Sequence, residues 1–195
     1  MLNAEQGGLL LRLARHTLEA EFGRRKRTAA PEIPNDPIFQ EHRGVFISLI
    51  KRDQLRGCIG SLLGIEPLAD AVRRHTVNAA FSDRRFPMLS ADELPDVRIE
   101  ISVLTAPHQL AYTDGEDLVC KLRPRVDGVI IKMPQGMGAT FLPQVWHELP
   151  DPEIFLEQLC RKAGLPGNAW HSSGLIVQTY QAVRFTEEEP PSWTN

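Results

Sequence analysis

The stretch GVFISLIKRDQLRGCIGS, residues 44–61, contains two runs of β-forming residues separated by the polar tetrapeptide KRDQ. A polar break between two such runs is typical of a β-hairpin, and it places Arg52 and Asp53 at the turn. Cys58 then lies on the second strand. This stretch decides the fold class because it predicts antiparallel pairing next to the chain's first helix.

Side chains alternate along an extended strand, so neighbours in sequence point to opposite faces. One face takes Leu55, Gly57 and Ile59, and the other takes Arg56, Cys58 and Gly60. The Cα atoms of Arg56 and Cys58 would be about 6.6 Å apart, which lets the guanidinium fold back toward the sulfur and stabilise a thiolate. The spacing therefore makes Cys58 a candidate nucleophile or metal ligand, with Arg56 as the group that stabilises its thiolate.

The two glycines beside Cys58 fit two interpretations. They open the backbone to a ligand, or they let the strand pack closely against its neighbours. Free cysteine is also among the most buried residue types. From the residues alone, a reactive thiol and an inert core thiol both remain open.

A helix is predicted from Pro67 through LADAVRRHTVNAAFSD, because Leu68, Val72, His75 and Ala79 form an apolar stripe. On that stripe His75 is either a catalytic base or a packed core histidine. Asp83, Arg84 and Arg85 follow the helix, and they either form local ion pairs or bind a carboxylate or phosphate.

The segment VRIEISVLT, residues 97–105, alternates between apolar and polar residues and predicts a half-buried strand. Glu100 lies on its polar face, as a candidate general base or as a solvated or paired carboxylate. Asn3 and Gln6 have capping-box spacing before a helix that ends at Gly23, and Asp151 precedes another helix that ends at Gly164. A hairpin around Gly136 and Gly138, and a closing strand, GLIVQTYQAVRF, complete an α+β pattern of mixed or antiparallel sheets with flanking helices.

Length, composition and charge limit the classes of function that the chain can have. The chain has 195 residues, 42% hydrophobic residues and a net charge of −3, which are values of an ordinary globular protein. The basic run RRKR, residues 24–27, reads as a solvated turn at a helix end, so a nucleic-acid partner is not favoured. No stretch approaches the length of a membrane span.

Cys58, Cys120 and Cys160 are far apart and form no C-x-x-C pair, which fits a reducing, cytoplasmic setting without a disulfide framework or a zinc site. Cys120 and Cys160 are expected on apolar, buried helix faces. No cofactor motif is present, and the scattered histidines give no metal-ligand spacing. Residues 187–195 read as an acidic C-terminal tail.

In order along the chain, LRGCIGS, AAFSDRRFPMLSADELPDVRIEISVLT, DGVIIKMPQGMGATFLPQVW and FLEQLCRKAGL resemble the AMMECR family. The resemblance covers about residues 3–185 and implies one AMMECR-type domain over residues 1–186. It implies a large lobe built from both termini, a smaller lobe, and an R-G-C-I-G strand near a cleft between them. The family's hallmark positions fall on Leu55, Arg56, Gly57, Cys58, Ile59 and Gly60, with Asp83, Arg85, Phe86 and Pro87 as a second block.

Prokaryotic relatives resemble one member of the three-part AmmeMemoRadiSam system, beside a Memo-like protein and a radical S-adenosylmethionine enzyme. The resemblance thus implies an accessory protein whose partners are separate chains, binding a small ligand or a partner's segment through Gly57, Ile59, Gly60, Asp83, Arg85 and Phe86. The alternative is a cysteine-dependent enzyme, with Cys58 as nucleophile or redox thiol, Arg56 beside it, and Glu100 or His75 as proton carrier.

Overall fold

The computed structural model describes residues 2–23, 31–133, 136, 138–171 and 174–187. The chain divides into two compact units. The first takes in the residues up to Leu104 and those from Val183 onward, and the second runs from Thr105 to Ala182. Helices and antiparallel sheets give the predicted α+β class.

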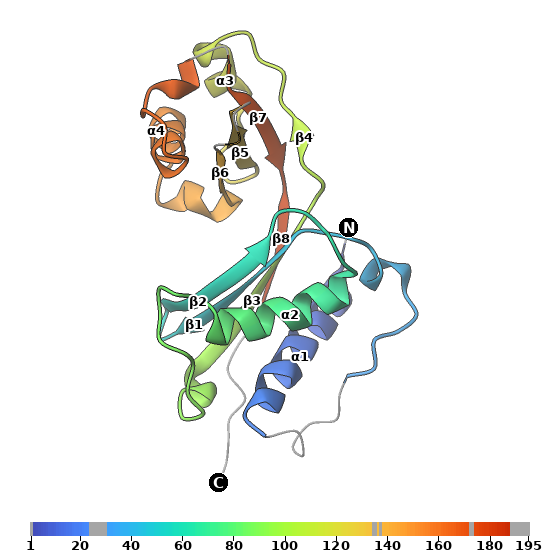
Figure 1. Ribbon diagram of the computed structural model, residues 1–195. Coiled ribbons are helices and arrows are strands. Elements are labelled where there is room, and N and C mark those ends of the chain that lie inside the picture. The colour runs from blue at the N-terminus through green and yellow to red at the C-terminus, as the bar shows by residue number, and fades with distance from the viewer. Residues whose placement is uncertain (1, 24–30, 134–135, 137, 172–173, 188–195) are drawn as a thin grey trace. The chain divides into compact units, whose positions relative to one another are not determined.

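In its described residues, the first unit contains two α-helices and a four-stranded sheet (Figure 1). The helices are α1 (Ala4–Glu21) and α2 (Leu68–Phe81). The strands are β1 (Val45–Lys51), β2 (Gln54–Ser61), β3 (Val97–Leu104) and β8 (Ala182–Thr186), in the order β2-β1-β3-β8. Strand β2 is therefore an edge strand.

Local signals account for these elements. The predicted capping box is present at α1, where Asn3 and Gln6 exchange two hydrogen bonds of 2.9 Å. Strands β1 and β2 form the predicted hairpin, with Arg52 and Asp53 at φ values of 50° and 60° in the turn. Two consecutive positive φ values are typical of a tight hairpin turn whose twist matches that of the strands.

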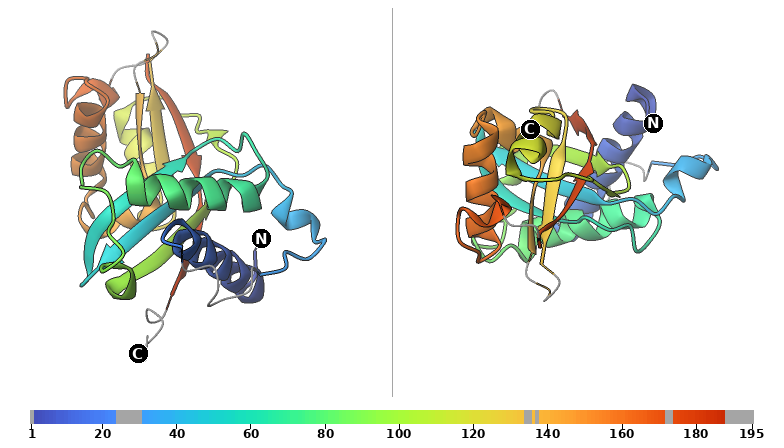
Figure 2. Two further views of the ribbon diagram at one scale, coloured as in Figure 1. Left: turned by 60° about the horizontal axis from the view of Figure 1, so that its bottom comes forward. Right: turned by 90° about the horizontal axis from the view of Figure 1, so that it is seen from above.

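Helices α1 and α2 pack on one face of this sheet (Figures 1 and 2). That face carries the apolar side chains of β1 and β3: Val45, Ile47, Leu49, Val97, Ile99, Ile101 and Val103, all at most 2% exposed. The opposite face carries Ser48 on β1, opposed by Cys58 on β2 and by Glu100 on β3.

The second unit has its own core. Its strands β4 (His108–Gln109), β5 (Gly128–Lys132), β6 (Gly138–Phe141) and β7 (Ile176–Tyr180) take the order β4-β7-β5-β6. Helices α3 (Gly115–Lys121) and α4 (Pro152–Lys162) accompany them. Trp146 stacks on Phe155 with ring centroids 3.7 Å apart, at the centre of this core.

Two expectations need correction. The closing strand is two strands, β7 in the second unit's sheet and β8 in the first unit's. Cys120 is exposed on α3, because this short helix buries Leu118 and turns Cys120 outward, whereas Cys160 on α4 is fully buried as predicted.

The RRKR run and most of the acidic tail lie outside the described residues. In the part of the chain that is described, no helix is long and apolar enough to cross a membrane.

Candidate functional site

Cys58 lies at the edge of the first unit's sheet, on the face away from α2. Its neighbour Gly57 faces the helix, since a Cβ there would lie 2.2 Å from the carbonyl oxygen of Ala79. Alternation therefore turns the Cys58 side chain to the other face. There the hydroxyl of Ser48 donates a hydrogen bond of 3.3 Å to Sγ of Cys58, which is half-buried.

The segment that follows α2 covers the free edge of the strand at Cys58. Asp83 is 8% exposed, and its Oδ2 accepts a hydrogen bond of 2.8 Å from the backbone N–H of Cys58. Arg85 Nη2 donates to the carbonyl oxygen of Cys58 at 3.3 Å. Side chains thus satisfy both peptide groups that an edge strand would leave open.

Arg85 is held in place by Asp83. Its Nε and Nη2 donate to the two carboxylate oxygens at 3.0 and 2.7 Å. This pairing is the main reason that the pKa of Asp83 falls to about 2. The pKa of Arg85 is raised, first by Asp83 and to a smaller extent by the side chain of Cys58.

One end of this guanidinium remains available. The Arg85 side chain is 58% exposed, and its Nη1 has no hydrogen-bond partner among the described residues. The ring of Phe86 lies 5.4 Å from the guanidinium carbon. Ser48, Cys58, Asp83 and Arg85 are called the Cys58 cluster below. A thiol and a pre-oriented guanidinium at one surface can bind an anionic group.

Arg56 does not belong to this cluster. A β-bulge leaves Arg56 without a partner on β1, because Leu49 pairs with Gly57 and Ile50 pairs with Leu55. A bulge redirects a side chain. Arg56 accordingly binds the carboxylate of Glu93, with Nε and Nη2 at 2.9 and 2.8 Å.

The remaining donors of Arg56 are also used. Nη1 donates to the carbonyl oxygen of Pro87 at 2.9 Å. Lys51, two residues beyond Leu49 and hence on the helix-covered face, binds the same carboxylate as Arg56. The guanidinium of Arg56 therefore does not turn back to the sulfur of Cys58 but ties the bulge to the segment before β3.

His75 lies on the other side of the sheet from the Cys58 thiol. It is 3% exposed on α2, and its Nε2 is 3.2 Å from Nη2 of Arg74. Burial lowers its pKa most, and Arg74 lowers it further, while Glu66 raises it. His75 is a core histidine in this fold and has no path to the sulfur of Cys58.

Glu100 is in the same row as Cys58 but two strands away. Ser48 on β1 opposes both residues, so the Cα atoms of Cys58 and Glu100 are about 10 Å apart. Glu100 lies near Arg184 and Arg98, at 3.8 and 4.0 Å. Its carboxylate therefore balances arginines and is not within direct reach of the thiol.

The glycines and Ile59 of the motif serve packing. Gly57 lets β2 approach α2, and a Cβ at Gly60 would lie 2.3 Å from the carbonyl oxygen of Val45. Ile59 packs against the core of the first unit. Of the predicted ligand-binding residues, Asp83 and Arg85 contact the backbone of Cys58, and Phe86 lies beside the Arg85 guanidinium. Gly57, Gly60 and Ile59 lie against neighbouring backbone or core.

Sequence reasoning missed Ser48 and Glu93. The bulge hid Ser48, because counting register from the turn without it pairs Cys58 with Ile47. Glu93 stands three residues after Ser90, which is the spacing of a capping box. It does accept from the Ser90 N–H, but its main partners are Arg56 and Lys51.

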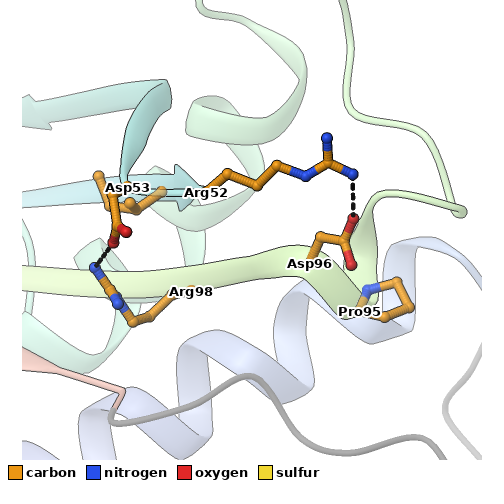
Figure 3. A pocket seen from close by; sticks show the side chains of 6 residues that line it. Arg52, Asp53, Pro95, Asp96 and Arg98 are labelled. Carbon is orange, nitrogen blue, oxygen red and sulfur yellow. Dashed lines mark hydrogen bonds and ion pairs between the residues drawn. The ribbon is translucent and has the colours of Figure 1, made fainter.

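A surface hollow of about 330 Å³ lies at the other end of the β1–β2 hairpin (Figure 3). Its walls include two ion pairs, Arg52 with Asp96 at 3.8 Å and Arg98 with Asp53 at 3.3 Å. Arg52 and Asp53 are more than 80% exposed, so these charges are balanced and solvated. The described residues that line the hollow include no cysteine, and their charged side chains pair with one another.

Metal chemistry gains no support from the side chains. Among the described residues, no group of three histidine, cysteine, aspartate or glutamate side chains could hold a metal ion. The chemistry of the Cys58 cluster therefore rests on a thiol, a hydroxyl, a carboxylate and a guanidinium.

Comparison with known proteins places this arrangement in a family. Residues 11–185 match the AMMECR1 family model. A protein from Thermofilum pendens is 40% identical, over 97% of this chain and 93% of its own, and one from Methanothermobacter thermautotrophicus is 37% identical, over 96% and 97%. The crystal structure of an uncharacterised protein from Pyrococcus horikoshii matches with a TM-score of 0.85 at 33% identity, covering 97% of this chain and 95% of its own. The chain belongs to the AMMECR1 family.

Proposed function

We propose that this protein is a binding component of a modification pathway, and that the Cys58 cluster holds an anionic group of a small ligand. The observation that carries the proposal is the state of Arg85. Its guanidinium is fixed by Asp83 and by the Cys58 carbonyl, yet Nη1 and more than half of the side chain remain open. A guanidinium that is already oriented loses little freedom when it binds a carboxylate or phosphate.

The geometry favours binding over general acid–base catalysis. A general base must come within hydrogen-bond reach of the proton that it takes. His75 lies across the sheet and Glu100 lies two strands away, so neither predicted proton carrier meets this condition. Ligand binding needs only the groups that the cluster has.

The family resemblance extends the proposal to partners. A Memo-like protein and a radical S-adenosylmethionine enzyme, as separate chains, would receive or supply the ligand that the Cys58 cluster holds. We expect this pathway to be cytoplasmic, because three unpaired cysteines suit a reducing compartment.

A cysteine-dependent enzyme is the second candidate. The hydrogen bond from Ser48 to the sulfur of Cys58 favours it, because a donated hydrogen bond stabilises a thiolate. The activating arginine in that case is Arg85 and not Arg56.

The test is a titration of the native protein with inorganic phosphate, followed by NMR at the backbone amides of Cys58 and Arg85. We expect the chemical shifts of these amides to change until phosphate saturates the site. The apparent affinity should fall as salt increases, since ion pairing at an exposed site is screened. Arg85→Gln should abolish them, whereas Arg84→Gln, the same change at the exposed neighbour, should leave them. Shifts that are equal in both variants, or absent in the wild type, would refute an anion site at this cluster.

The same titration with a short RNA or DNA duplex tests the weakest alternative, which is that the protein binds nucleic acid. With a net charge of −3 we expect no saturable binding to either polyanion. Binding that falls steeply with salt would instead favour a nucleic-acid partner.

A further inference from the structure

The first unit has a histidine inside its core. His75 on α2 is 3% exposed, whereas the other five histidines of the chain are exposed or only partly buried. Its Nε2 lies 3.2 Å from Nη2 of Arg74. Because a guanidinium nitrogen can only donate, Nε2 is the acceptor and the neutral ring carries its proton on Nδ1. Nδ1 is buried and has no hydrogen-bond partner among the described residues.

Protonation of His75 would change its contact with Arg74. The charged ring has a proton on Nε2, so the acceptor for Arg74 disappears and two positive groups face each other in a buried position. Burial and Arg74 therefore lower the pKa of His75, and Glu66 raises it to a smaller extent. Glu66 is itself held by Arg74, whose Nε donates to its carboxylate at 2.6 Å.

Other charged groups near α2 have partners of their own. The elements that pack against α2 are α1, β1, β2 and the short turn η1 (Pro37–Phe39). The titratable residues that are buried or partly buried on these elements are Arg15, His16, Glu19, Lys51 and Arg56. Arg15 pairs with Glu187, Lys51 and Arg56 pair with Glu93, and Glu19 also has an interaction partner. A proton on His75 would thus meet the cation Arg74 and a carboxylate, Glu66, that already binds this cation.

Helix α2 lies in close contact with the strand that carries Cys58. Ala79 is one turn after His75 on the same stripe of the helix. A Cβ at Gly57 would be 2.2 Å from the carbonyl oxygen of Ala79, so helix and strand touch through their backbones. Any loosening of α2 at His75 therefore changes a contact with β2.

The end of α2 also holds the segment that covers the edge of β2 at Cys58. Carbonyl oxygens in its last turn accept hydrogen bonds of 2.8 Å from the N–H groups of Ser82 and Leu89. These two residues lie on either side of Asp83 and Arg85 in the chain. The position of the cover thus depends on the position of α2.

We propose that His75 is an acid-sensitive latch in the first unit. In its neutral form, His75 accepts a hydrogen bond from Arg74 and packs α2 on the sheet. In its protonated form, it repels Arg74, so that α2 loosens and the segment of Asp83 and Arg85 no longer covers the edge at Cys58. As regulation of the anion site this inference rests on the proposed function, but as a change in the fold it does not.

The pH at which the latch acts follows from the direction of the pKa shift. His75 has its ordinary pKa of 6.5 in the unfolded chain and a lower pKa in the folded protein. Below pH 6.5 the unfolded chain therefore binds more protons, so the stability that neutral His75 supports is complete above pH 6.5 and is lost as the pH falls toward the folded-state pKa. Asp83 and Glu93, with pKa values of about 2, stay ionised well below this range.

The experiment measures hydrogen exchange of backbone amides in the full chain by NMR between about pH 7.5 and about pH 5. Each rate is compared with the intrinsic rate at the same pH to give a protection factor. We expect protection in α2 and at the N–H of Cys58, which Asp83 binds, to fall at least about tenfold over this range. Amides in β5 and β7 should keep their protection, because the histidines of the second unit are exposed.

Matched variants assign the effect to one side chain. His75→Gln keeps an acceptor for Arg74 but cannot take a proton, so its protection factors should not change with pH in this range. His75→Leu suits the apolar stripe of α2 and should also lose the pH dependence, whatever its overall stability. His16→Gln makes the first of these changes at a partly buried histidine of α1 and should keep the pH dependence of the wild type.

The imidazole resonances in the same samples provide a second readout. If His75 titrates as the exposed histidines do and protection stays constant, the latch is overturned. It is also overturned if His75→Gln loses protection on acidification as the wild type does. If protection falls as expected but phosphate does not bind near Arg85, the latch stands and the proposed function fails. If phosphate binds and protection does not depend on pH, the proposed function stands and the latch fails.

Discussion

At the scale of single residues, two arginines near Cys58 differ in what they contact. Arg56 uses all its donor nitrogens on Glu93 and on the carbonyl oxygens of Pro87 and Met88, so it is a structural residue. Arg85 uses Nε and Nη2 and leaves Nη1 free of described partners. The sequence motif draws attention to the first arginine, but the geometry of the site favours the second.

Replacing Arg56 tests its structural role. Arg56→Gln should lower the free energy of unfolding by about 2 kcal/mol, because Glu93 loses a bidentate partner and keeps only Lys51. Arg73→Gln is the control, since its pair with Asp70 is exposed and worth about 0.5 kcal/mol or less. Urea unfolding measures both. Equal losses would mean that Arg56 is not a structural anchor.

Glu93 should also make stability depend on pH. Arg56 is the main cause that lowers its pKa from 4.5 to about 2. Between these two pKa values, Glu93 is protonated in the unfolded chain and ionised in the folded protein. Its contribution to the free energy of unfolding is therefore complete above pH 4.5 and is lost as the pH falls toward 2. We expect the stability difference between the wild type and Glu93→Gln to shrink over that range. A difference independent of pH between 6 and 2.5 would contradict this assignment.

At the scale of elements, the R-G-C-I-G strand is shaped by how closely it approaches its neighbours. Gly57→Ala should cost about 3 kcal/mol, because the new methyl group meets the Ala79 carbonyl at 2.2 Å and α2 must move. Gly8→Ala is a control for which we expect stability to rise instead of fall. Gly8 lies within α1 with space for a methyl group, so alanine there should stabilise the protein by about 0.5 to 1 kcal/mol. Calorimetry or urea unfolding of both variants checks the pair.

Elements with strong local signals could be predicted from the sequence. The capping box at Asn3, the turn at Arg52 and Asp53, and the N-cap at Asp151 each depend on residues within a few positions of one another. The bulge at Arg56 could not be predicted, because the carboxylate that Arg56 binds there is 37 residues away in the chain. The sequence therefore placed Cys58 on the right strand but did not reveal that Arg56 binds Glu93.

At the scale of the whole molecule, the part of the chain that the structure describes forms two cores and two sheets. Periodicity indicated one closing strand over residues 174–185, since alternation does not reveal which sheet a strand joins. The structure divides this stretch between both units, as β7 and β8. The fold class and the elements were thus predictable, but the partition of strands between units was not.

Tyr180 offers a test of the second unit's core. Burial raises its pKa from 10.0 to about 12, while its hydroxyl lies 2.9 Å from Thr140 Oγ1. The unfolded chain loses this proton first, so the contribution to stability is complete below pH 10 and is lost as the pH rises through 12. We expect ultraviolet titration to show Tyr180 ionising only with unfolding, and Tyr180→Phe to reduce the loss of stability over this range. Ionisation near pH 10 in folded protein would contradict the burial.

In the proposed function, Cys58 presents its thiol beside an arginine, Arg85, that binds anions. The most direct measurement compares alkylation of each cysteine in the native protein by iodoacetate, an anion, and by iodoacetamide, its neutral analogue. The ratio of the iodoacetate rate to the iodoacetamide rate at Cys120 serves as the reference for an exposed thiol. Mass spectrometry of the wild type, Arg85→Gln, Arg84→Gln and Arg56→Gln gives all the rates.

We predict that the iodoacetate-to-iodoacetamide ratio is several-fold higher at Cys58 than at Cys120, and that only Arg85→Gln brings the two ratios together. Such a result would establish both access to the thiol and the role of Arg85. A Cys58 that stays as unreactive as Cys160 until the protein unfolds, or a ratio that is unchanged in Arg85→Gln, would contradict the account.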